Sequence, residues 1–155
     1  MRSITATTAS TPVTATSQMV WNSDSTGMII DDSPSWRLFT GQTYDQWKGV
    51  GWLDAIHPDD RERAASIWTS AIANKAIYQT EYRVMHADGE YRWTSVRAVP
   101  LHHEDGSIRE WIGTNTDITE AKTVESELAR RLQAERRHSA VLAKVAAASN
   151  QLHTA

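Results

Sequence analysis

The chain of 155 residues contains no cysteine. This absence excludes disulfides, thiolate metal sites, nucleophilic thiols and photochemistry that forms a bond to cysteine. The formal net charge is −3, and lysines and arginines form no dense run outside residues 130–137. Such a chain has no overall basic field to attract a phosphate backbone, so we expect no nucleic-acid partner.

Long apolar runs and catalytic fingerprints are missing as well. No run approaches the ~18 apolar residues of a membrane span, and the N-terminus lacks the apolar stretch of a secretory signal. We therefore expect a cytoplasmic protein with no membrane partner. The sequence also has no phosphate-binding glycine loop, dinucleotide fingerprint or nucleophile elbow. No motif in the sequence indicates a reaction, so we expect a non-catalytic module.

The aromatic content is one phenylalanine against seven tryptophans, and every tryptophan lies between residues 21 and 111. Large aromatic side chains are retained mostly where they are buried, so the packed domain should end soon after residue 111. Residues 1–18 are mostly Ser, Thr and Ala and read as a flexible leader. The expected organisation is therefore a leader over 1–18, a domain over 19–119 and a helix over 120–155.

Local patterns predict an α+β domain. Two short β-prone runs over 19–24 and 28–32 read as an opening hairpin, and three short helices follow up to residue 56. His57-Pro58-Asp59-Asp60 is typical of a helix start, and the helix should run to about Lys75. Three longer strands over 77–86, 90–103 and 107–119 follow, joined by turns at Asp88-Gly89 and Asp105-Gly106. His57 is expected to cap its helix rather than to bind a metal.

The last 36 residues lack glycine and proline, which predicts one long helix with Thr119 as its N-cap. Its apolar residues fit a heptad seam that is interrupted by Arg131, Glu135 and His138. A second copy of the same helix is the expected partner, which predicts a homodimer through a weak coiled coil. The seam residues are Val124, Leu128, Leu142, Val145 and Leu152.

Four blocks of this sequence, in order and spacing, resemble the PAS family of sensor domains. These blocks are Trp52 to Arg61, Glu81 to Val84, Asp88 to Trp93, and Trp111 to Thr119, with Gly106 between the last two. The resemblance implies a five-stranded antiparallel sheet, helices on one face, and a pocket between sheet and helices. It also implies that a signal leaves through a helix that starts at Asp117-Ile118-Thr119. Residues 130–155 then resemble the connecting helix that leads to a GAF domain or a histidine kinase of a bacterial two-component system.

The resemblance leaves the sensed signal unknown. Haem-binding relatives carry a histidine on the long helix, and this helix has none, so we expect no haem. Covalent flavin photochemistry needs a cysteine, which the chain lacks. A non-covalently held flavin or a small-molecule ligand stays open. Strand alternation suggests which side chains face the pocket. The candidate pocket residues are Tyr82, Val84, Thr94, Val96, Trp111 and Asn115.

Two functions of different classes remain. The first is a sensory module that dimerises and relays a change of packing through its C-terminal helix to an effector. The second is a ligand-free interaction module, which exposed Trp93, Val99 and Trp111 on the sheet would favour. A small-molecule carrier or lyase is a weaker third reading, because the sequence offers no titratable group for it.

Overall fold

The computed structural model describes residues 17–153; the expected leader falls almost entirely outside the described residues. Contacts within the chain divide it into two units, residues 1–119 and 120–155. The two units are described separately below.

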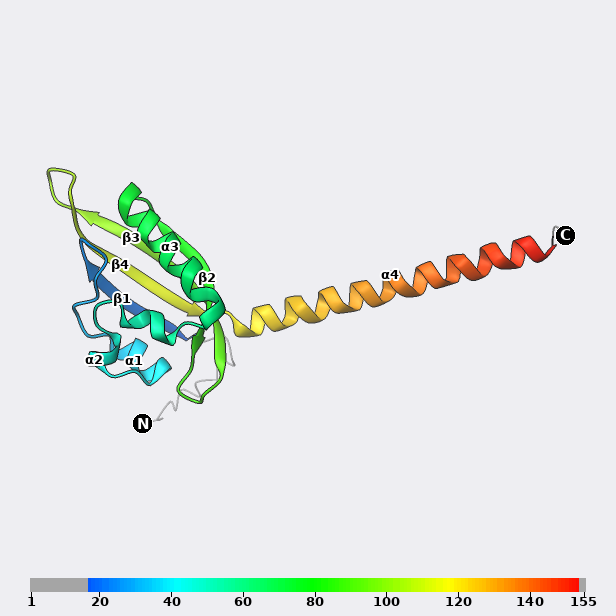
Figure 1. Ribbon diagram of the computed structural model, residues 1–155, viewed down its shortest axis with the longest axis horizontal. Helices are drawn as coiled ribbons and strands as arrows, with labels where there is room; N and C mark the ends of the chain where they lie inside the picture. Colours follow the sequence, from blue (N-terminus) through cyan, green and yellow to red (C-terminus); the bar gives the residue numbers. More distant parts are fainter. Residues whose placement is uncertain (1–16, 154–155) are drawn as a thin grey trace, which may run out of the picture. The chain divides into compact units, whose positions relative to one another are not determined.

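The first unit contains a four-stranded antiparallel sheet in the order β1-β4-β3-β2 (Figure 1). Its strands are β1 (Gln18–Asp24), β2 (Tyr78–Met85), β3 (Tyr91–His102) and β4 (Ile108–Asp117). The three later strands confirm the predicted meander. Gly89 and Gly106 adopt φ values of 88° and 85°, the left-handed geometry that the two Asp-Gly turns require.

The expectation of five strands is wrong, because the segment after β1 does not join the sheet. The carboxylate of Asp24 accepts hydrogen bonds from the backbone N–H of Thr26 and of Met28, both at 2.9 Å, which turns the chain away from β1. Ile29 then exchanges two backbone hydrogen bonds with Gly49, at 3.0 and 2.7 Å. The predicted second strand is therefore reduced to a single bridge.

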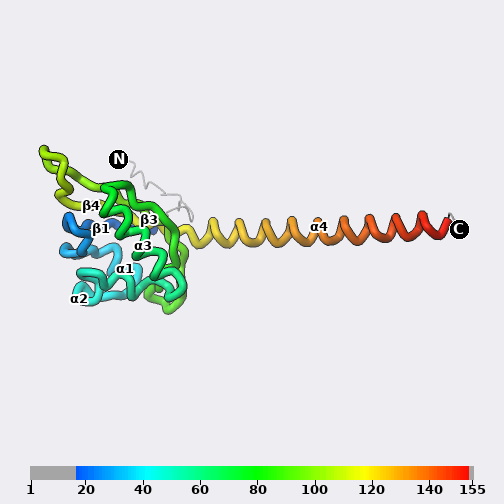
Figure 2. Tube along the Cα trace, turned by 45° about the horizontal axis from the view of Figure 1, so that its top comes forward, coloured from blue at the N-terminus to red at the C-terminus, as the bar shows by residue number. Residues whose placement is uncertain are grey.

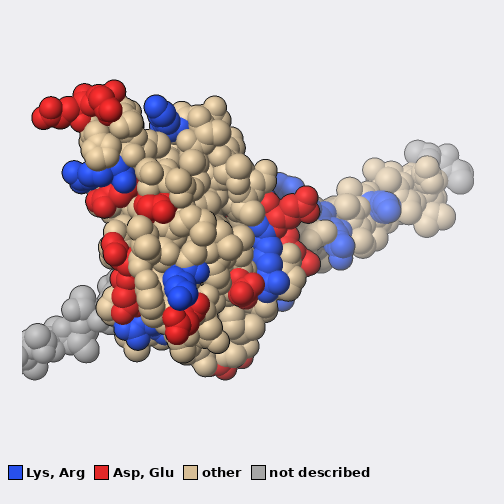
Figure 3. Space-filling model, turned by 60° about the vertical axis from the view of Figure 1, so that its left-hand side comes forward, with Lys and Arg blue, Asp and Glu red and all other residues tan. Residues whose placement is uncertain are grey.

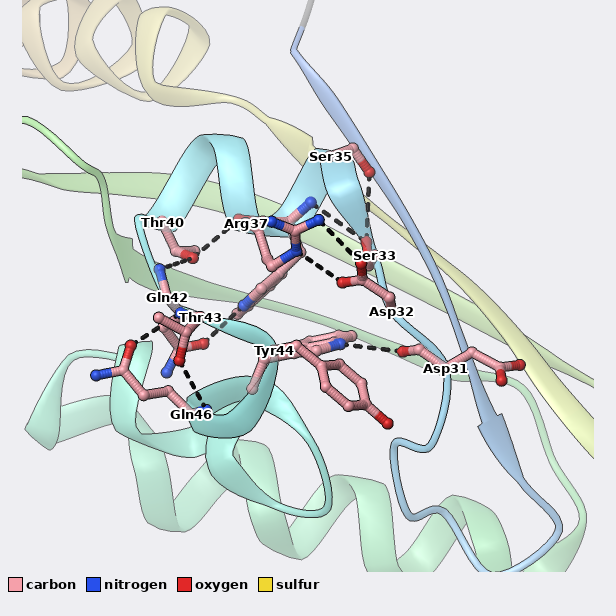
Figure 4. Close-up of polar contacts among 12 residues, drawn as sticks. Asp31, Asp32, Ser33, Ser35, Arg37, Thr40, Gln42, Thr43, Tyr44 and Gln46 are labelled. Carbon is pink, nitrogen blue, oxygen red and sulfur yellow. Dashed lines mark hydrogen bonds and ion pairs between the residues drawn. The ribbon is translucent and has the colours of Figure 1, made fainter.

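Four helices connect β1 to β2: α1 (Pro34–Thr40), α2 (Tyr44–Trp47), η1 (Gly51–Ala55) and α3 (Pro58–Asn74). Ser33 caps α1, and Thr43 forms a capping box with Gln46 at α2 (Figure 4). His57 caps α3 as expected, since its Nδ1 accepts a 3.1 Å hydrogen bond from the backbone N–H of Asp59. These caps explain why such short helices hold fixed positions.

The helices lie on one face of the sheet, and the core fills the space between them (Figures 1 and 2). Alternate residues of every strand face this layer. Six tryptophans are among the core side chains, and both the helices and the sheet supply them. They are Trp21, Trp36, Trp47, Trp52, Trp68 and Trp111.

The second unit is the helix α4 (Thr119–His153), which includes Thr119 from the first unit as its first residue. None of its residues is buried. Arg131 forms a 2.8 Å ion pair with Glu127, four residues earlier, which is typical of an exposed helix face. All five seam residues are at least half exposed, and Leu132 and Val141 add to the exposed apolar set. Across residues 17–153 no helix is both long enough and apolar enough to cross a bilayer.

Candidate internal site and helix junction

A cavity of about 10 Å³ lies inside the first unit, between the sheet and the helices. Its wall is almost entirely aromatic. The lining residues are Trp21, Gly27, Ile29, Trp36, Trp47, Trp52, Trp68, Tyr78, Tyr82 and Asn115. The wall contains no charged side chain, and its polar side-chain groups outside the indoles are the hydroxyls of Tyr78 and Tyr82 and the amide of Asn115.

The indoles are held in place by bonds that point away from the cavity. Trp36 and Trp47 pack with ring centroids 4.8 Å apart. Their indole N–H groups donate to the Gln42 side chain at 2.7 Å and to the carbonyl of Asp31 at 3.2 Å (Figure 4). Each ring therefore presents carbon rather than nitrogen to the interior.

Trp68 of α3 occupies the centre of the aromatic cluster. Its ring lies 5.8 Å from that of Trp21, 4.9 Å from that of Tyr78 and 5.1 Å from that of Trp111. A Cβ at Gly27 would lie 2.9 Å from the Trp68 indole nitrogen and 2.3 Å from Ile72, so only glycine permits this approach.

A hydrogen-bonded network crosses the floor of the cavity. The Trp21 indole N–H donates to Asn115 Oδ1 at 2.8 Å. Asn115 Nδ2 donates to the Tyr82 hydroxyl at 3.0 Å and to Thr94 Oγ1 at 3.2 Å, and Thr94 donates to the Tyr82 carbonyl at 3.2 Å. Burial raises the pKa of Tyr82, so its phenol stays protonated at physiological pH.

The six predicted pocket residues all lie buried on the inner face, as the alternation indicated. Only Tyr82 and Asn115 line the cavity; the other four fill the core around it. Sequence reasoning missed the tryptophans that form the wall. Their unusual number was the available signal, but it does not say which of them share one cavity.

Asp117, Ile118 and Thr119 form a tight junction where β4 ends. The Asp117 carboxylate accepts hydrogen bonds from the N–H of Thr119 at 2.9 Å and from its hydroxyl at 2.7 Å. The backbone of Trp93 binds the same segment twice: its N–H donates to Thr119 Oγ1 at 3.0 Å, and its carbonyl accepts from Ile118 N–H at 2.8 Å. The Thr119 hydroxyl thus bonds both to β3 and to Asp117, and α4 begins at Thr119 itself.

An ion pair links α3 to Arg83 of β2, which lies beside Trp93 of the junction. Asp60 in the first turn of α3 is 5 % exposed and accepts three 2.9 Å hydrogen bonds from Arg83, one from its N–H and two from its guanidinium. These bonds, helped by Arg63, hold the pKa of Asp60 at about 2. The Arg83 guanidinium lies 5.2 Å from the ring centroid of its cross-strand partner Trp93.

Exposure of Trp93, Val99 and Trp111 on the sheet would favour the ligand-free interaction module. Trp111 is fully buried, so it gives that function no support. Trp93 and Val99 are partly exposed. Among the described residues Trp111 Nε1 has no hydrogen-bond partner.

The described residues offer no group of three or more His, Asp or Glu side chains that could hold a metal ion. The histidine pair His102-His103 lies at the hairpin after β3, where both residues are exposed. A haem or flavin does not fit the interior, because the cavity holds about one water-sized molecule and α3 carries no histidine. The face drawn in Figure 3 shows Lys and Arg interspersed with Asp and Glu.

Comparison with known proteins agrees with this architecture. The family model described as PAS fold matches residues 29–115. The chain therefore belongs to the PAS family.

Curated relatives and a solved structure extend the comparison. The uncharacterized protein y4lL of Sinorhizobium fredii is 34 % identical over 105 residues, which are 68 % of this chain and 13 % of that protein. The sensor protein FixL of Bradyrhizobium diazoefficiens is 30 % identical over 112 residues, which are 72 % of this chain and 22 % of FixL. The chain thus spans less than a quarter of the length of either relative.

The crystal structure of a sensory box histidine kinase/response regulator from Burkholderia thailandensis has a TM-score of 0.60 and 26 % identity; the match covers 78 % of this chain and 92 % of that one. Together with the family match, this identifies the chain as a sensory PAS domain followed by a long helix.

Proposed function

We propose that this chain is the non-catalytic sensory part of a signalling protein, which relays a change of packing around its aromatic cavity through the Trp93–Thr119 junction into α4. The observation that carries the proposal is the double attachment of Trp93 to Ile118 and Thr119. Any movement of β3 relative to β4 must stretch these bonds, and the first turn of α4 then shifts.

The inner network supplies one route to the junction. Asn115 lies two residues before Asp117 on β4, and Thr94, the residue after Trp93, is the register partner of Asp117. A change at the cavity that moves Asn115 or Thr94 therefore acts within two residues of Asp117 or next to Trp93, and both of these residues bond to Thr119. The Asp60–Arg83–Trp93 contacts supply a second route, from the start of α3.

The same proposal covers how α4 passes the signal on to an effector. The seam of α4 is apolar and exposed at both ends but polar at Arg131, Glu135 and His138. A pair of such helices is held weakly enough to occupy two registers, and a ligand or partner that favours one shifts their populations. The effector would be a histidine kinase or a GAF-linked domain in cis, in a bacterial two-component system. A cytoplasmic location remains a prediction.

The alternative is a ligand-free interaction module. The cavity favours it, because a space of about 10 Å³ holds no metabolite unless tryptophans move. Both functions use α4 as a dimer helix, and they differ in whether the interior influences α4. An experiment on that influence separates them.

The test is a chimera in which α4 continues in register into the dimerisation helix of a histidine kinase, with autophosphorylation as the readout. Trp21→Phe removes the N–H that binds Asn115 but keeps an aromatic ring in place. We expect this change to shift kinase activity, and we expect Thr119→Val in the same chain to abolish the shift.

Thr69→Ala serves as the control, because the exposed Thr69 hydroxyl bonds only to the Ala65 carbonyl of its own helix. This substitution should leave the effect of Trp21→Phe intact. A kinase that ignores Trp21→Phe would favour the interaction module. A shift that survives Thr119→Val would place the relay elsewhere.

A further inference from the structure

We infer that the hydroxyl of Tyr82 donates a hydrogen bond to a single water-sized molecule, water itself, bound in the aromatic cavity. The inference deepens the proposed function, on which it rests in treating this cavity as the sensory site. It follows from the direction of each hydrogen bond in the buried network.

The first step is the orientation of the Asn115 amide. The Trp21 indole nitrogen is only a donor, so the Asn115 atom 2.8 Å away must be the oxygen. The amide nitrogen therefore points toward β2 and β3. Its two hydrogens go to the Tyr82 hydroxyl and to Thr94 Oγ1.

The second step is the direction of the remaining hydroxyls. Thr94 accepts from Asn115 and donates its own proton to the Tyr82 carbonyl. The Tyr82 oxygen accepts from Asn115, so its proton is left over. Among the described residues no acceptor for this proton is found, although the side chain is 2 % exposed and lines the cavity.

The third step is the need for an acceptor. A buried donor without a partner is costly and rare in folded proteins. The other tyrosine of the wall obeys this rule, because the Tyr78 hydroxyl donates to the Ala64 carbonyl at 3.2 Å. For Tyr82, a molecule in the cavity must be the acceptor, as the Ala64 carbonyl is for Tyr78.

The fourth step is the size of the occupant. A cavity of about 10 Å³ has room for about one water molecule. Such a water accepts from Tyr82 and donates to the second lone pair of Asn115 Oδ1. The resting site therefore binds one small hydrogen-bond acceptor, and a larger ligand must replace this contact to Tyr82 and displace a tryptophan.

The experiment is a set of crystal structures of the 155-residue chain, at a resolution that shows ordered water, for the natural sequence, Tyr82→Phe and Tyr78→Phe. We expect one ordered water within hydrogen-bond distance of Tyr82 Oη in the natural chain and in Tyr78→Phe. We expect it to be lost in Tyr82→Phe. The natural chain and Tyr78→Phe suffice if Tyr82→Phe does not fold.

Three results would overturn the inference: Tyr82 donating to a protein carbonyl, a water peak unchanged in Tyr82→Phe, or density for a ligand larger than water. The kinase chimera does not depend on the occupant. Failure of the water site therefore leaves the relay standing, and failure of the relay leaves the water peak in place.

Discussion

The backbone N–H of Trp93 donates a 3.0 Å hydrogen bond to the hydroxyl of Thr119, a residue 26 positions further along the chain. The bond ties the middle of the meander to the first turn of the exit helix. Because Thr119 in turn bonds to Asp117, the junction is fixed from both strands that it joins. This attachment is the basis of the proposed relay from β3 and β4 into α4.

The Asp60–Arg83 pair should give the domain a marked acid sensitivity. The pKa of Asp60 in the folded protein, about 2, lies below the ordinary aspartate value of 3.8. The carboxylate therefore stabilises the fold fully above pH 3.8, and this contribution is lost as the pH falls through 2. We expect Asp60→Asn to lower the free energy of unfolding near neutral pH by roughly 1–3 kcal/mol. The difference should shrink as the pH approaches 2, as measured by urea unfolding across pH.

Asp59→Asn is the matched control for this measurement, because the Asp59 side chain is 79 % exposed. It should change the unfolding free energy by only a few tenths of a kcal/mol. Equal effects of the two substitutions would show that Asp60 contributes only its charge at the helix start.

Gly113 of β4 is required for the position of Trp21. A Cβ at residue 113 would lie 2.3 Å from Trp21 Cζ2, so the indole would have to leave the sheet surface and its bond to Asn115. We expect Gly113→Ala to cost roughly 2–3 kcal/mol in denaturant unfolding. Gly89→Asn, at a position with no atom within 4 Å of the added Cβ, should cost about 1 kcal/mol or less. A neutral Gly113→Ala would mean that Trp21 is mobile.

The α4 seam should determine the oligomeric state. We expect Leu128→Glu to weaken self-association at least tenfold, about 1.4 kcal/mol, because it places a charge in the apolar end of the seam. Ala129→Glu puts the same charge outside the seam, about 100° further around the helix, and should leave association unchanged. Sedimentation velocity measures both variants, and equal behaviour would exclude a dimer through this face.

The purified protein should show no absorption band between about 300 and 700 nm. The reason is the size of the cavity, which holds about one water molecule and no haem or flavin. A Soret or flavin band in freshly purified protein would mean that the tryptophan wall opens to a cofactor. The cofactor would then be the leading candidate for the signal.

The elements were predictable where their signals are local. The cap at His57, the capping box at Thr43 and the Asp-Gly turns each depend on residues a few positions apart. The missing fifth strand depends instead on a non-local partner, since Gly49 rather than β1 takes the backbone bonds of Ile29. No pattern within residues 28–32 indicates that choice.

For the candidate site, only the face of the sheet on which the strand residues lie could be predicted. Alternation along the strands placed Tyr82 and Asn115 on the inner face, because side-chain direction follows directly from the strand period. The wall of Trp36, Trp47 and Trp68 could not be predicted in the same way. Those residues come from three helices, and their meeting depends on how the helices pack on the sheet.

The most direct test of the relay is amide hydrogen exchange at Trp93 and Ile118 in the 155-residue chain, compared between the natural sequence and Trp21→Phe. We predict that the protection factors of these two amides fall at least ten times further than those of Tyr82 in β2 and Val96 in the middle of β3. A uniform loss of protection would report only lower global stability. Unchanged protection at Ile118 would contradict a connection between the cavity and α4.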